Sequence, residues 1–344
     1  MTRRPIMFRE YLKMIIAGIE LDEEQMTEMI AVVLSGDITD AQIGAMMAAL
    51  ATRGETYAEL AGAAKAMRRK AQRIQPPGAI VVDTCGTGGD GAQTFNISTT
   101  TAFVVAGCGV IVAKHGNRSV SSQCGSADLL EALGIKIDTA PEIVEEALHE
   151  VGIGFLFAPV YHSAMRHAAR ARTEIGLRSI FNMLGPLTNP AGANCQLLGV
   201  YAPELTEMFA RALSHLGARQ AMVVHGHDGL DEISVCASTR ISELKDGLVK
   251  TFDLSPQQFF GRLAEPAALA GGDSTANAAI TRDILEGAKG DKRNVVVLNA
   301  AAALICAGQA ADFPAGIEMA AESIDSGAAR EKLARLATFT TENG

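Results

Sequence analysis

Asp83-Thr-Cys-Gly-Thr-Gly-Gly-Asp-Gly91 is the stretch of sequence that decides the fold. It follows an apolar run at 79–82, which indicates a buried strand. Its four glycines let the backbone approach a ligand closely, with N–H groups free to point at it. Asn96-Ile-Ser-Thr-Thr100 then adds amide and hydroxyl groups at the start of an apolar helix, where exposed N–H groups favour phosphate oxygens. A glycine-rich loop between a strand and a helix predicts an α/β fold with an anion-binding site.

A second polar stretch, Lys114-His-Gly-Asn-Arg-Ser-Val-Ser-Ser122, follows the next strand-like run at 110–113. It combines two cations, an imidazole, an amide and three serines. In open parallel sheets, ligands bind beyond the carboxyl ends of the strands, which is where both polar stretches should lie. Together they predict an anionic ligand that carries several phosphates.

The first 74 residues are predicted to be helical. Asp22 can cap a helix over 23–34, and the segments 39–42 and 56–59 both match the capping box. An isolated helical domain of about 70 residues buries little surface, so it would be only marginally stable. Its alanine- and methionine-rich stripe is therefore expected to pack either on the rest of the chain or on a second subunit.

The pattern changes after the break at Gln75-Pro-Pro-Gly78. Strand-like runs now alternate with helical ones, which predicts right-handed βαβ units. We therefore expect an α/β protein with a small N-terminal helical domain, residues 1–74, and a larger α/β domain, residues 75–344, with a mostly parallel central sheet. The expected strands lie at 79–83, 109–114, 135–138, 153–158, 196–201, 221–226 and 233–237, with a hairpin over 242–252 about Asp246-Gly247. The expected helices lie at 98–107, 126–133, 141–151, 161–172 and 204–216, and in the chain from Thr275 onward.

The composition excludes several classes of protein. With 48% hydrophobic and 20% charged residues among 344, the chain is that of a packed globular protein, long enough for about two domains. A formal net charge of −9 argues against a general nucleic-acid binder. The six cysteines form no CxxC pair, which fits reduced thiols in the cytosol better than a disulfide frame or a zinc site. Secretory and membrane-spanning runs are missing, so we expect a cytoplasmic protein without a membrane partner.

Two known nucleotide-binding motifs do not fit the glycine-rich loop. Gly86, Gly88 and Gly91 satisfy GxGxxG, but the dinucleotide fingerprint needs an acidic residue about 20 positions later. No Asp or Glu occurs between Asp90 and Asp128. A Walker A loop fails as well, because no Gly-Lys-Ser/Thr follows. A glycine-rich turn without any ligand remains an alternative for the loop alone, but the second polar stretch argues against it.

Two carboxylates stand side by side at the end of His225-Gly-His-Asp-Gly-Leu-Asp-Glu232. Asp231 and Glu232 follow a strand and suit Mg²⁺, which prefers a few carboxylates together with water and phosphate oxygens. A solvated acidic turn is the alternative interpretation. His227 is interpreted as a surface residue.

Basic residues gather in one expected helix. His162 and Arg166 would share a face of it, and Arg172 would follow almost three turns later. An arginine beside a pocket can form a forked pair with a substrate carboxylate. For Arg166, Arg170 and Arg178 we prefer ion pairs on a surface helix.

Together these stretches closely resemble the anthranilate phosphoribosyltransferase family of tryptophan synthesis. The motifs that carry the resemblance occur in the family's order and spacing: Gly86-Thr-Gly-Gly-Asp90, Asn96-Ile-Ser-Thr99, Lys114-His-Gly-Asn-Arg-Ser-Val-Ser-Ser122, Phe181-Asn-Met-Leu-Gly-Pro-Leu-Thr-Asn-Pro190 and Asp231-Glu232. The resemblance implies that part of 163–185 joins the helical domain and that the substrates lie between the two domains. It also implies a homodimer through the helical domain, and it raises anthranilate synthase as a further partner.

The resemblance implies three sets of site residues. Phosphoribosyl pyrophosphate would be held by Gly86, Gly89, Asp90, Thr94, Asn96, Ile97, Ser98, Thr99, Lys114, His115, Gly116, Asn117, Arg118, Ser119, Val120, Ser121, Ser122 and Ser126. The anthranilate site would be lined by Gly86, Asn117, His162, Arg172 and Pro186. Mg²⁺ would be held by Ser98, Asp231 and Glu232, with two ions expected in each subunit.

The implied reaction transfers the phosphoribosyl group of phosphoribosyl pyrophosphate to the amine of anthranilate, with release of pyrophosphate. Mg²⁺, Lys114 and loop N–H groups would stabilise the leaving group electrostatically. Arg172 and Asn117 would orient the aromatic acid. His115 and His162 are both candidates for a general base, and the sequence does not choose between them.

Two alternatives from other classes stay open. A pyrimidine nucleoside phosphorylase is similar in fold, but it carries a different loop where this chain has 115–118 and needs no Asp-Glu pair. A nucleic-acid-binding relative should lose Arg172 or the Asp231-Glu232 pair and gain basic surface, whereas this chain keeps them and is acidic.

Overall fold

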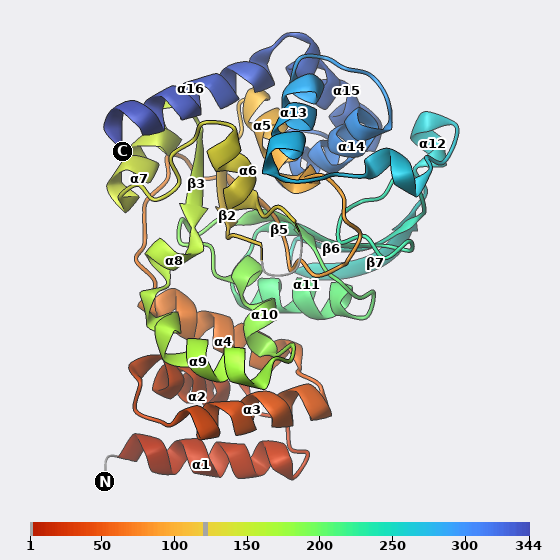
Figure 1. Ribbon diagram of the computed structural model, residues 1–344. Helices are drawn as coiled ribbons and strands as arrows, with labels where there is room; N and C mark the ends of the chain where they lie inside the picture. The colour runs from red at the N-terminus through yellow and green to blue at the C-terminus, as the bar shows by residue number, and fades with distance from the viewer. Residues whose placement is uncertain (1–2, 120–122) are drawn as a thin grey trace.

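The computed structural model describes residues 3–119 and 123–344, which form a helical bundle at the N-terminus and a larger α/β body stacked on it (Figure 1). The strands are β1 Val81–Gly86, β2 Ile111–Gly116, β3 Ile153–Phe157, β4 Cys195–Gly199, β5 Gln220–Gly226, β6 Thr239–Lys245 and β7 Leu248–Leu254. The α-helices are α1 Arg3–Ile16, α2 Glu23–Ser35, α3 Asp40–Arg53, α4 Tyr57–Lys70, α5 Ile97–Gly107, α6 Ser126–Ala132, α7 Pro141–Glu150, α8 Ala158–Tyr161, α9 Arg166–Ile175, α10 Ile180–Met183, α11 Leu205–His215, α12 Gln257–Phe260, α13 Ser274–Leu285, α14 Asp291–Cys306, α15 Phe313–Asp325 and α16 Ala328–Asn343. Short 3-10 turns lie at η1 Ser163–Met165, η2 Gly185–Leu187 and η3 Pro266–Leu269.

The helices of the bundle begin at the residues that their capping motifs predict. The side chain of Asp22 accepts a hydrogen bond from the third N–H of α2, and Thr39 and Thr56 do the same at α3 and α4. In each case the residue at the third position returns a hydrogen bond to the cap, so two otherwise unpaired N–H groups are satisfied. The capping predictions are therefore confirmed.

The bundle does not stand alone. α9 packs against α2 and α3, although it lies far from them in the sequence (Figure 1). α11 packs between α4 on one side and β5 and β6 on the other. One continuous apolar core therefore runs from the bundle through α11 to one face of the sheet. Of the two expected partners for the apolar stripe, the rest of the chain is the one seen here.

The described strands form one seven-stranded sheet in the order β3-β2-β1-β4-β5-β6-β7. β1 to β5 pair in parallel, and β6 and β7 add an antiparallel hairpin at one edge. This confirms the mostly parallel sheet and the hairpin about Asp246-Gly247. β2 and β3 follow β1 on one side of it, and β4 and β5 lie on its other side. The direction in which strands are added therefore reverses beside β1. Ligands of open α/β sheets bind at such a point.

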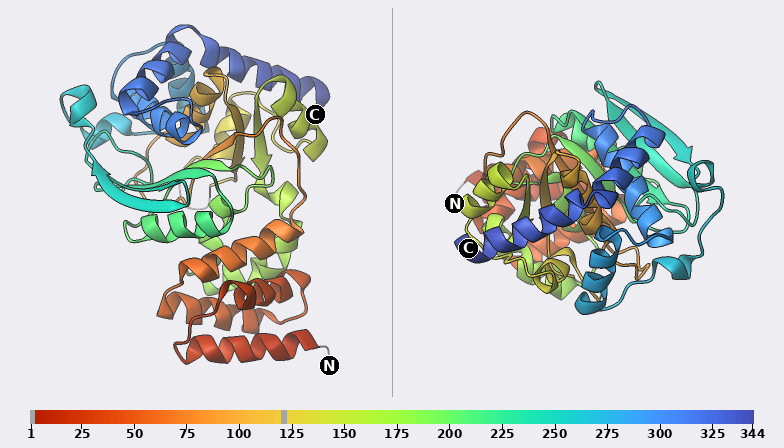
Figure 2. Two further views of the ribbon diagram at one scale, coloured as in Figure 1. Left: turned by 180° about the vertical axis from the view of Figure 1, so that it is seen from behind. Right: turned by 90° about the horizontal axis from the view of Figure 1, so that it is seen from above.

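The sheet has its two faces covered by different parts of the chain. α5, α14 and α16 pack on one face, with α13 and α15 packed against these helices, and α11 separates the other face from the bundle (Figure 2). The arrow of β3 points toward the bundle, so the carboxyl ends of the parallel strands face it as well (Figure 1). No described helix has the length and apolar character needed to cross a membrane.

Two expected strands are wrong. Over 135–138 the two isoleucines are buried as a strand would bury them, but the N–H of Ile135 donates to Leu130 O at 2.9 Å and that of Lys136 to Thr340 Oγ1 at 3.2 Å. Over 233–237 the N–H of Ile233 donates to Asn299 Oδ1 at 2.9 Å. In both segments these N–H groups are satisfied outside any ladder. Burial alternates over 135–138, whereas Ile233, Ser234 and Val235 are buried in succession, and neither pattern requires a strand.

Two further expectations need correction. The expected helix over 161–172 is interrupted at His162, whose backbone leaves the helical region before η1, and α9 begins only at Arg166. His162 and Arg166 therefore do not share a face of one helix. β1 and β2 also run beyond their expected ends to Gly86 and Gly116, because those glycines still pair with neighbouring strands.

Candidate functional site

The glycine-rich loop and the acidic segment meet at the carboxyl end of β1. The N–H of Gly88 donates to Asp231 Oδ2 at 2.9 Å, and the N–H of Asp231 lies 3.4 Å from Asp90 Oδ2. A Cβ added to Gly86 would lie 2.7 Å from Asp231 Oδ2, so only glycine permits this close approach. Segments more than 130 positions apart in the chain are thus joined at one edge of the sheet.

Glu232 connects the acidic segment to the start of α5. Its Oε1 accepts a hydrogen bond from the N–H of Ser98 at 3.0 Å, and the residue is only 8% exposed. Burial, together with Asp90, raises the pKa of Asp231 to about 7. Burial, together with Asp231, raises the pKa of Glu232 to about 8. Asp90, Asp231 and Glu232 are thus three neighbouring carboxyl groups that Lys114 and backbone N–H groups compensate only in part, since the pKa values of Asp231 and Glu232 stay raised, and a cation is favoured beside them.

The donors at this place are oxygens of the kind that Mg²⁺ prefers. Within residues 3–119 and 123–344, no group of three or more His, Cys, Asp or Glu side chains is arranged to enclose a metal ion. Mg²⁺ commonly binds through one or two carboxylates, waters and substrate phosphates rather than in an all-protein cage. The residues present therefore fit Mg²⁺ that arrives with a phosphorylated ligand.

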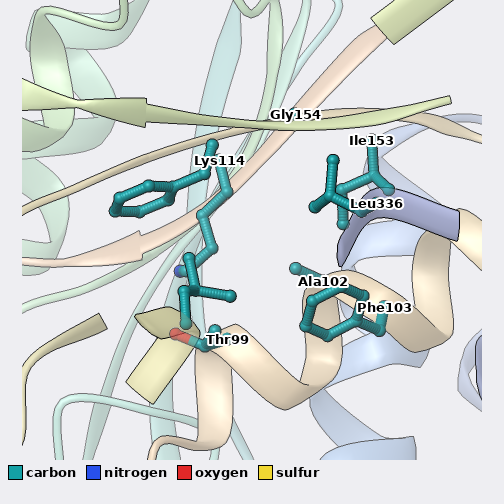
Figure 3. Close-up of a pocket in the computed structure, with 9 residues that line it drawn as sticks. Thr99, Ala102, Phe103, Lys114, Ile153, Gly154 and Leu336 are labelled. Carbon is teal, nitrogen blue, oxygen red and sulfur yellow. The ribbon is translucent and has the colours of Figure 1, made fainter. Parts of the chain in front are cut away.

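Lys114 lies at the centre of the site. It is 4% exposed, and its Nζ donates to Thr84 O and lies 3.5 Å from Ser98 Oγ. Burial lowers its pKa, whereas the nearby Asp83 works in the opposite direction. Figure 3 shows the side chain reaching from β2 toward the first turn of α5, where Thr99 lies. The small cavity beside it measures about 10 Å³, which has room for one water at most.

Two histidine rings pack against each other beside this lysine, with their planes tilted by 60°. The ring centres of His115 and His162 are 5.1 Å apart, and the buried Nε2 atom of each has no described hydrogen-bond partner. His115 Nδ1 lies 3.0 Å from Gly185 O, and because a carbonyl only accepts, Nδ1 carries the proton and Nε2 keeps its lone pair. Burial lowers the pKa of His115 to about 3 and that of His162 to about 4, so both rings are neutral at pH 7.

Arg172 lies on α9, on the side of the bundle. Its guanidinium carbon is 5.8 Å from the ring centre of Phe181, and burial lowers its pKa. It makes no ion pair with any residue that the structure describes, and burial alone accounts for the shift of its pKa. A half-buried guanidinium without a carboxylate partner is suited to an anionic group from outside. Pro186 is buried in η2, next to the carbonyl that His115 contacts.

The remaining predicted residues lie around the loop and the start of α5. Asn96 donates to Cys124 O at 3.0 Å and accepts from Asn277 at 3.0 Å, and Ser126 Oγ donates to Asn117 O at 3.1 Å. Ile97 and Thr99 are buried in the first turn of α5, Thr94 forms an isolated bridge with Ala270, and Gly116 ends β2. Val120, Ser121 and Ser122 lie outside the described residues.

The loop after β2 is held by α6. Arg118 pairs with Asp128 and with Glu131, and the N–H of Ser119 donates to Asp128 at 3.2 Å. The guanidinium of Arg118 is thus already bonded to two carboxylates. Its side chain is less available to a phosphate than the sequence suggested.

Of the interpretations of single surface residues, those of Arg170 and His227 agree with the structure and that of Arg178 does not. Arg170 pairs with Glu174 at 2.8 Å, as expected of a surface arginine, and His227 is exposed and hydrogen-bonds Asp253 at 3.0 Å. Arg178 is different, because it lies in the linker after α9 and donates to the carbonyl of Gly89. The interpretation of Arg178 as an ion-pair partner on a helix is therefore wrong.

Sequence reasoning missed Asp83 and Asn189 as parts of the site. Asp83 is fully buried in β1, where its Oδ1 accepts from the N–H of His115 at 3.1 Å and its Oδ2 accepts from Asn189 Nδ2 at 2.8 Å. A carboxylate just before a glycine-rich loop, and an asparagine between Thr188 and Pro190, were the available signals.

The comparisons with known proteins agree with this geometry. The chain matches the model of the glycosyl transferase family a/b domain over residues 78–330 and that of its helical bundle domain over residues 9–71. A relative from Syntrophobacter fumaroxidans, named anthranilate phosphoribosyltransferase, is 67% identical over 337 residues, covering 98% of this chain and 100% of the relative.

Solved structures resemble the whole chain. The crystal structure of anthranilate phosphoribosyltransferase from Thermus thermophilus has a TM-score of 0.90 at 42% identity, covering 96% of this chain and 99% of that one. The Saccharomyces cerevisiae enzyme in complex with PRPP and Mg has a TM-score of 0.87 at 28% identity, covering 97% and 98%. A further structure of the yeast enzyme holds 4-fluoroanthranilate and has a TM-score of 0.87 at 27% identity, covering 98% and 99%. With both domain models matched and a relative of 67% identity spanning nearly all of it, the chain belongs to the anthranilate phosphoribosyltransferase family.

Proposed function

We propose that this protein transfers the phosphoribosyl group of phosphoribosyl pyrophosphate to the amine of anthranilate, releasing pyrophosphate in the second step of tryptophan synthesis from chorismate. The observation that carries the proposal is the convergence of the glycine-rich loop, the buried Lys114 and the Asp231-Glu232 pair at the carboxyl end of β1 and β2. Such a site offers N–H groups and a cation to phosphates, and carboxylates to a metal ion.

The phosphates and ribose lie, in this proposal, over the loop after β1, the start of α5 and the loop after β2. The proposed ligand groups are Gly86, Gly89, Asp90, Thr94, Asn96, Ile97, Ser98, Thr99, Lys114, His115, Gly116, Asn117, Arg118, Ser119, Val120, Ser121, Ser122 and Ser126. Two of these are already engaged within the chain: the N–H of Ile97 donates to Phe95 O at 2.8 Å, and the guanidinium of Arg118 is paired with α6.

Mg²⁺ would be held by Ser98, Asp231 and Glu232, and we propose two ions in each subunit. When bound, Mg²⁺ neutralises negative charge that develops on the departing pyrophosphate. Lys114 adds a fixed positive charge in a site from which water is largely excluded, where such a charge acts most strongly.

Anthranilate lies on the side of the bundle, among Gly86, Asn117, His162, Arg172 and Pro186. Arg172 can bind the carboxylate through two parallel N–H···O bonds, because no described carboxylate already occupies it. The amine then attacks the anomeric carbon: a C–N bond forms, the bond to the pyrophosphate oxygen breaks, and the amine loses one proton.

The acceptor of that proton stays unassigned between His115, His162 and water. The lowered pKa of each histidine makes it a weak base, but its free Nε2 lone pair can accept a hydrogen bond from the amine and orient it. Holding the two reactants in line supplies much of the rate enhancement without a strong base.

We also propose how the chain is organised in the cell. The helical domain comprises residues 1–74 together with part of 163–185, and the α/β domain comprises the rest of 75–344. Three apolar side chains on or beside α1 support a homodimer through the helical domain, since Ile6, Ile16 and Ile19 are each at least half exposed. All six cysteines are free thiols, which supports a cytoplasmic location. Association with anthranilate synthase, which would supply the substrate, is a further proposal.

Product analysis tests the function. Purified protein is incubated with anthranilate, phosphoribosyl pyrophosphate and Mg²⁺, and the phosphoribosylated anthranilate is identified by mass spectrometry while pyrophosphate is measured enzymatically. Equal amounts of both products are expected. If neither forms, thymidine or uridine with phosphate, and then nucleic-acid binding, would test the two alternatives.

A further inference from the structure

We propose that Arg178 is a positioning residue for the phosphoribosyl pyrophosphate site, holding the glycine-rich loop through the carbonyl of Gly89. This inference rests on the proposed function, because it assigns the loop to that substrate. Arg178 lies in the linker between α9 and α10, which places it between the helix that carries Arg172 and the loop that follows β1.

The guanidinium of Arg178 is held in two directions. Its Nη2 donates to Gly89 O, and its Cζ lies 4.3 Å from the ring centre of Tyr201, just after β4. A planar guanidinium can stack on an aromatic face while its edge still donates hydrogen bonds, which a lysine ammonium cannot reproduce. The arginine therefore joins the linker, the loop and the end of β4 at one point.

This contact fixes the orientation of one peptide group in the loop. The peptide between Gly89 and Asp90 is trans and planar, so its C=O and N–H point in opposite directions. Because Gly89 O points at Arg178, the N–H of Asp90 points away from it. The side chain of Asp90 is restrained as well as its backbone, since its carboxylate lies 3.4 Å from the N–H of Asp231.

The loop needs such a restraint because of its own composition. Gly88, Gly89 and Gly91 all have positive φ, and glycine loses the most backbone freedom when it is ordered. A Cβ added to Gly89 would lie 2.7 Å from Arg178 Nη2, so glycine at this position also leaves room for the guanidinium. Pre-ordering the loop reduces the entropy that the substrate must overcome on binding.

The test compares steady-state kinetics of Arg178→Ala and Arg178→Lys with those of the wild type. We expect Arg178→Ala to raise the KM for phosphoribosyl pyrophosphate about tenfold, the size of one charge-assisted hydrogen bond, with the KM for anthranilate within about twofold. Arg178→Lys should recover only part of the effect. Tyr201→Leu should raise the same KM by about threefold, and adding it to Arg178→Ala should have no further effect.

Arg170→Ala is the matched control, because Arg170 is a neighbouring exposed arginine whose partners are Glu174 and Asp40, both outside the site. It should leave every kinetic constant within about twofold, as expected for an exposed ion pair. Titration calorimetry with phosphoribosyl pyrophosphate and Mg²⁺ should show the same loss of affinity in Arg178→Ala, with the Tm unchanged because the side chain is exposed.

Two results would overturn the proposal. One is an unchanged KM for phosphoribosyl pyrophosphate in both Arg178 variants. The other is a parallel loss of kcat, both KM values and Tm, which would indicate a general structural role; if Arg178→Ala does not fold, Arg178→Lys and Tyr201→Leu decide. A wild-type protein that neither binds nor turns over phosphoribosyl pyrophosphate would instead refute the proposed function.

Discussion

The carboxylate of Asp231 accepts a hydrogen bond from the backbone N–H of Gly88 at 2.9 Å, across 143 positions of sequence. The same carboxylate is one of the proposed Mg²⁺ ligands. The acid that would hold the metal therefore also shapes the loop that would hold the phosphates. Changes at this residue should affect both.

The acidic pair should be needed for turnover. Asp231→Asn combined with Glu232→Gln keeps the size of both side chains but removes the charges that suit a divalent ion. We expect a loss of activity of about a hundredfold or more at saturating Mg²⁺, measured as pyrophosphate release. Wild-type protein treated with EDTA should lose activity to a similar degree and regain it with Mg²⁺. Full activity in the double variant would remove these residues from the metal site.

Arg172→Ala should act mainly on anthranilate. The half-buried guanidinium makes no ion pair among the described residues, so removing it deletes the proposed ligand contact and, within the fold, the contact with the Phe181 ring at 5.8 Å. We expect the KM for anthranilate to rise about 10- to 100-fold, as for loss of a charged hydrogen-bond pair, with the KM for phosphoribosyl pyrophosphate changed little. Arg170→Ala serves as the control, and an unchanged anthranilate KM in Arg172→Ala would place Arg172 outside the substrate site.

Asp83 should give the metal-free protein a characteristic pH dependence of stability. Burial raises its pKa from 3.8 to about 6, so the folded state keeps a proton that the unfolded state has already lost. The contribution of Asp83 to the free energy of unfolding should therefore fall by roughly 3 kcal/mol as the pH rises from about 4 to about 6, and it is isolated from the other titrating groups by comparing wild type with a variant at this position.

Chemical denaturation at several pH values tests this, with Asp83→Asn as the variant. The variant cannot titrate at this position, so the difference between wild type and variant should shrink or reverse as the pH rises. Asp138→Asn, a change at an exposed position, should keep the wild-type profile. Parallel profiles for wild type and Asp83→Asn would contradict the raised pKa.

The dimer proposal makes its own prediction. Ile16 and Ile19 are 68% and 50% exposed, and apolar side chains at the surface favour a subunit contact. A charged side chain at either position would have to be buried in that contact, so it should prevent dimerisation. We expect sedimentation velocity to show a dimer for the wild type and a monomer for Ile16→Glu with Ile19→Glu. Leu248→Glu, at another exposed apolar position on the β6–β7 hairpin, should remain dimeric. A wild-type monomer would contradict the proposal.

Much of the fold could be predicted because local chemistry and tertiary structure agree. The capping boxes at Thr39 and Thr56 place two helices, and the alternation after Gly78 indicates the parallel sheet. The errors at 135–138 and 233–237 have one cause. A short apolar run reports that its side chains reach the core, but not whether a neighbouring strand is available to pair with the backbone.

The site could be predicted less completely for a similar reason. Glycine loops, Lys114 and the Asp231-Glu232 pair have recognisable local patterns. The roles of Arg178 and Asp83 depend on contacts with Gly89 and Asn189, which are distant in sequence and become visible only once the strands are assembled.

The central claim is tested most directly by following anthranilate fluorescence after mixing protein, phosphoribosyl pyrophosphate and Mg²⁺. A decline in fluorescence that requires all three components is the predicted result, and it should be absent with the Asp231→Asn, Glu232→Gln variant. Constant fluorescence with folded wild-type protein and fresh substrates would contradict the assignment of this site to phosphoribosyl transfer.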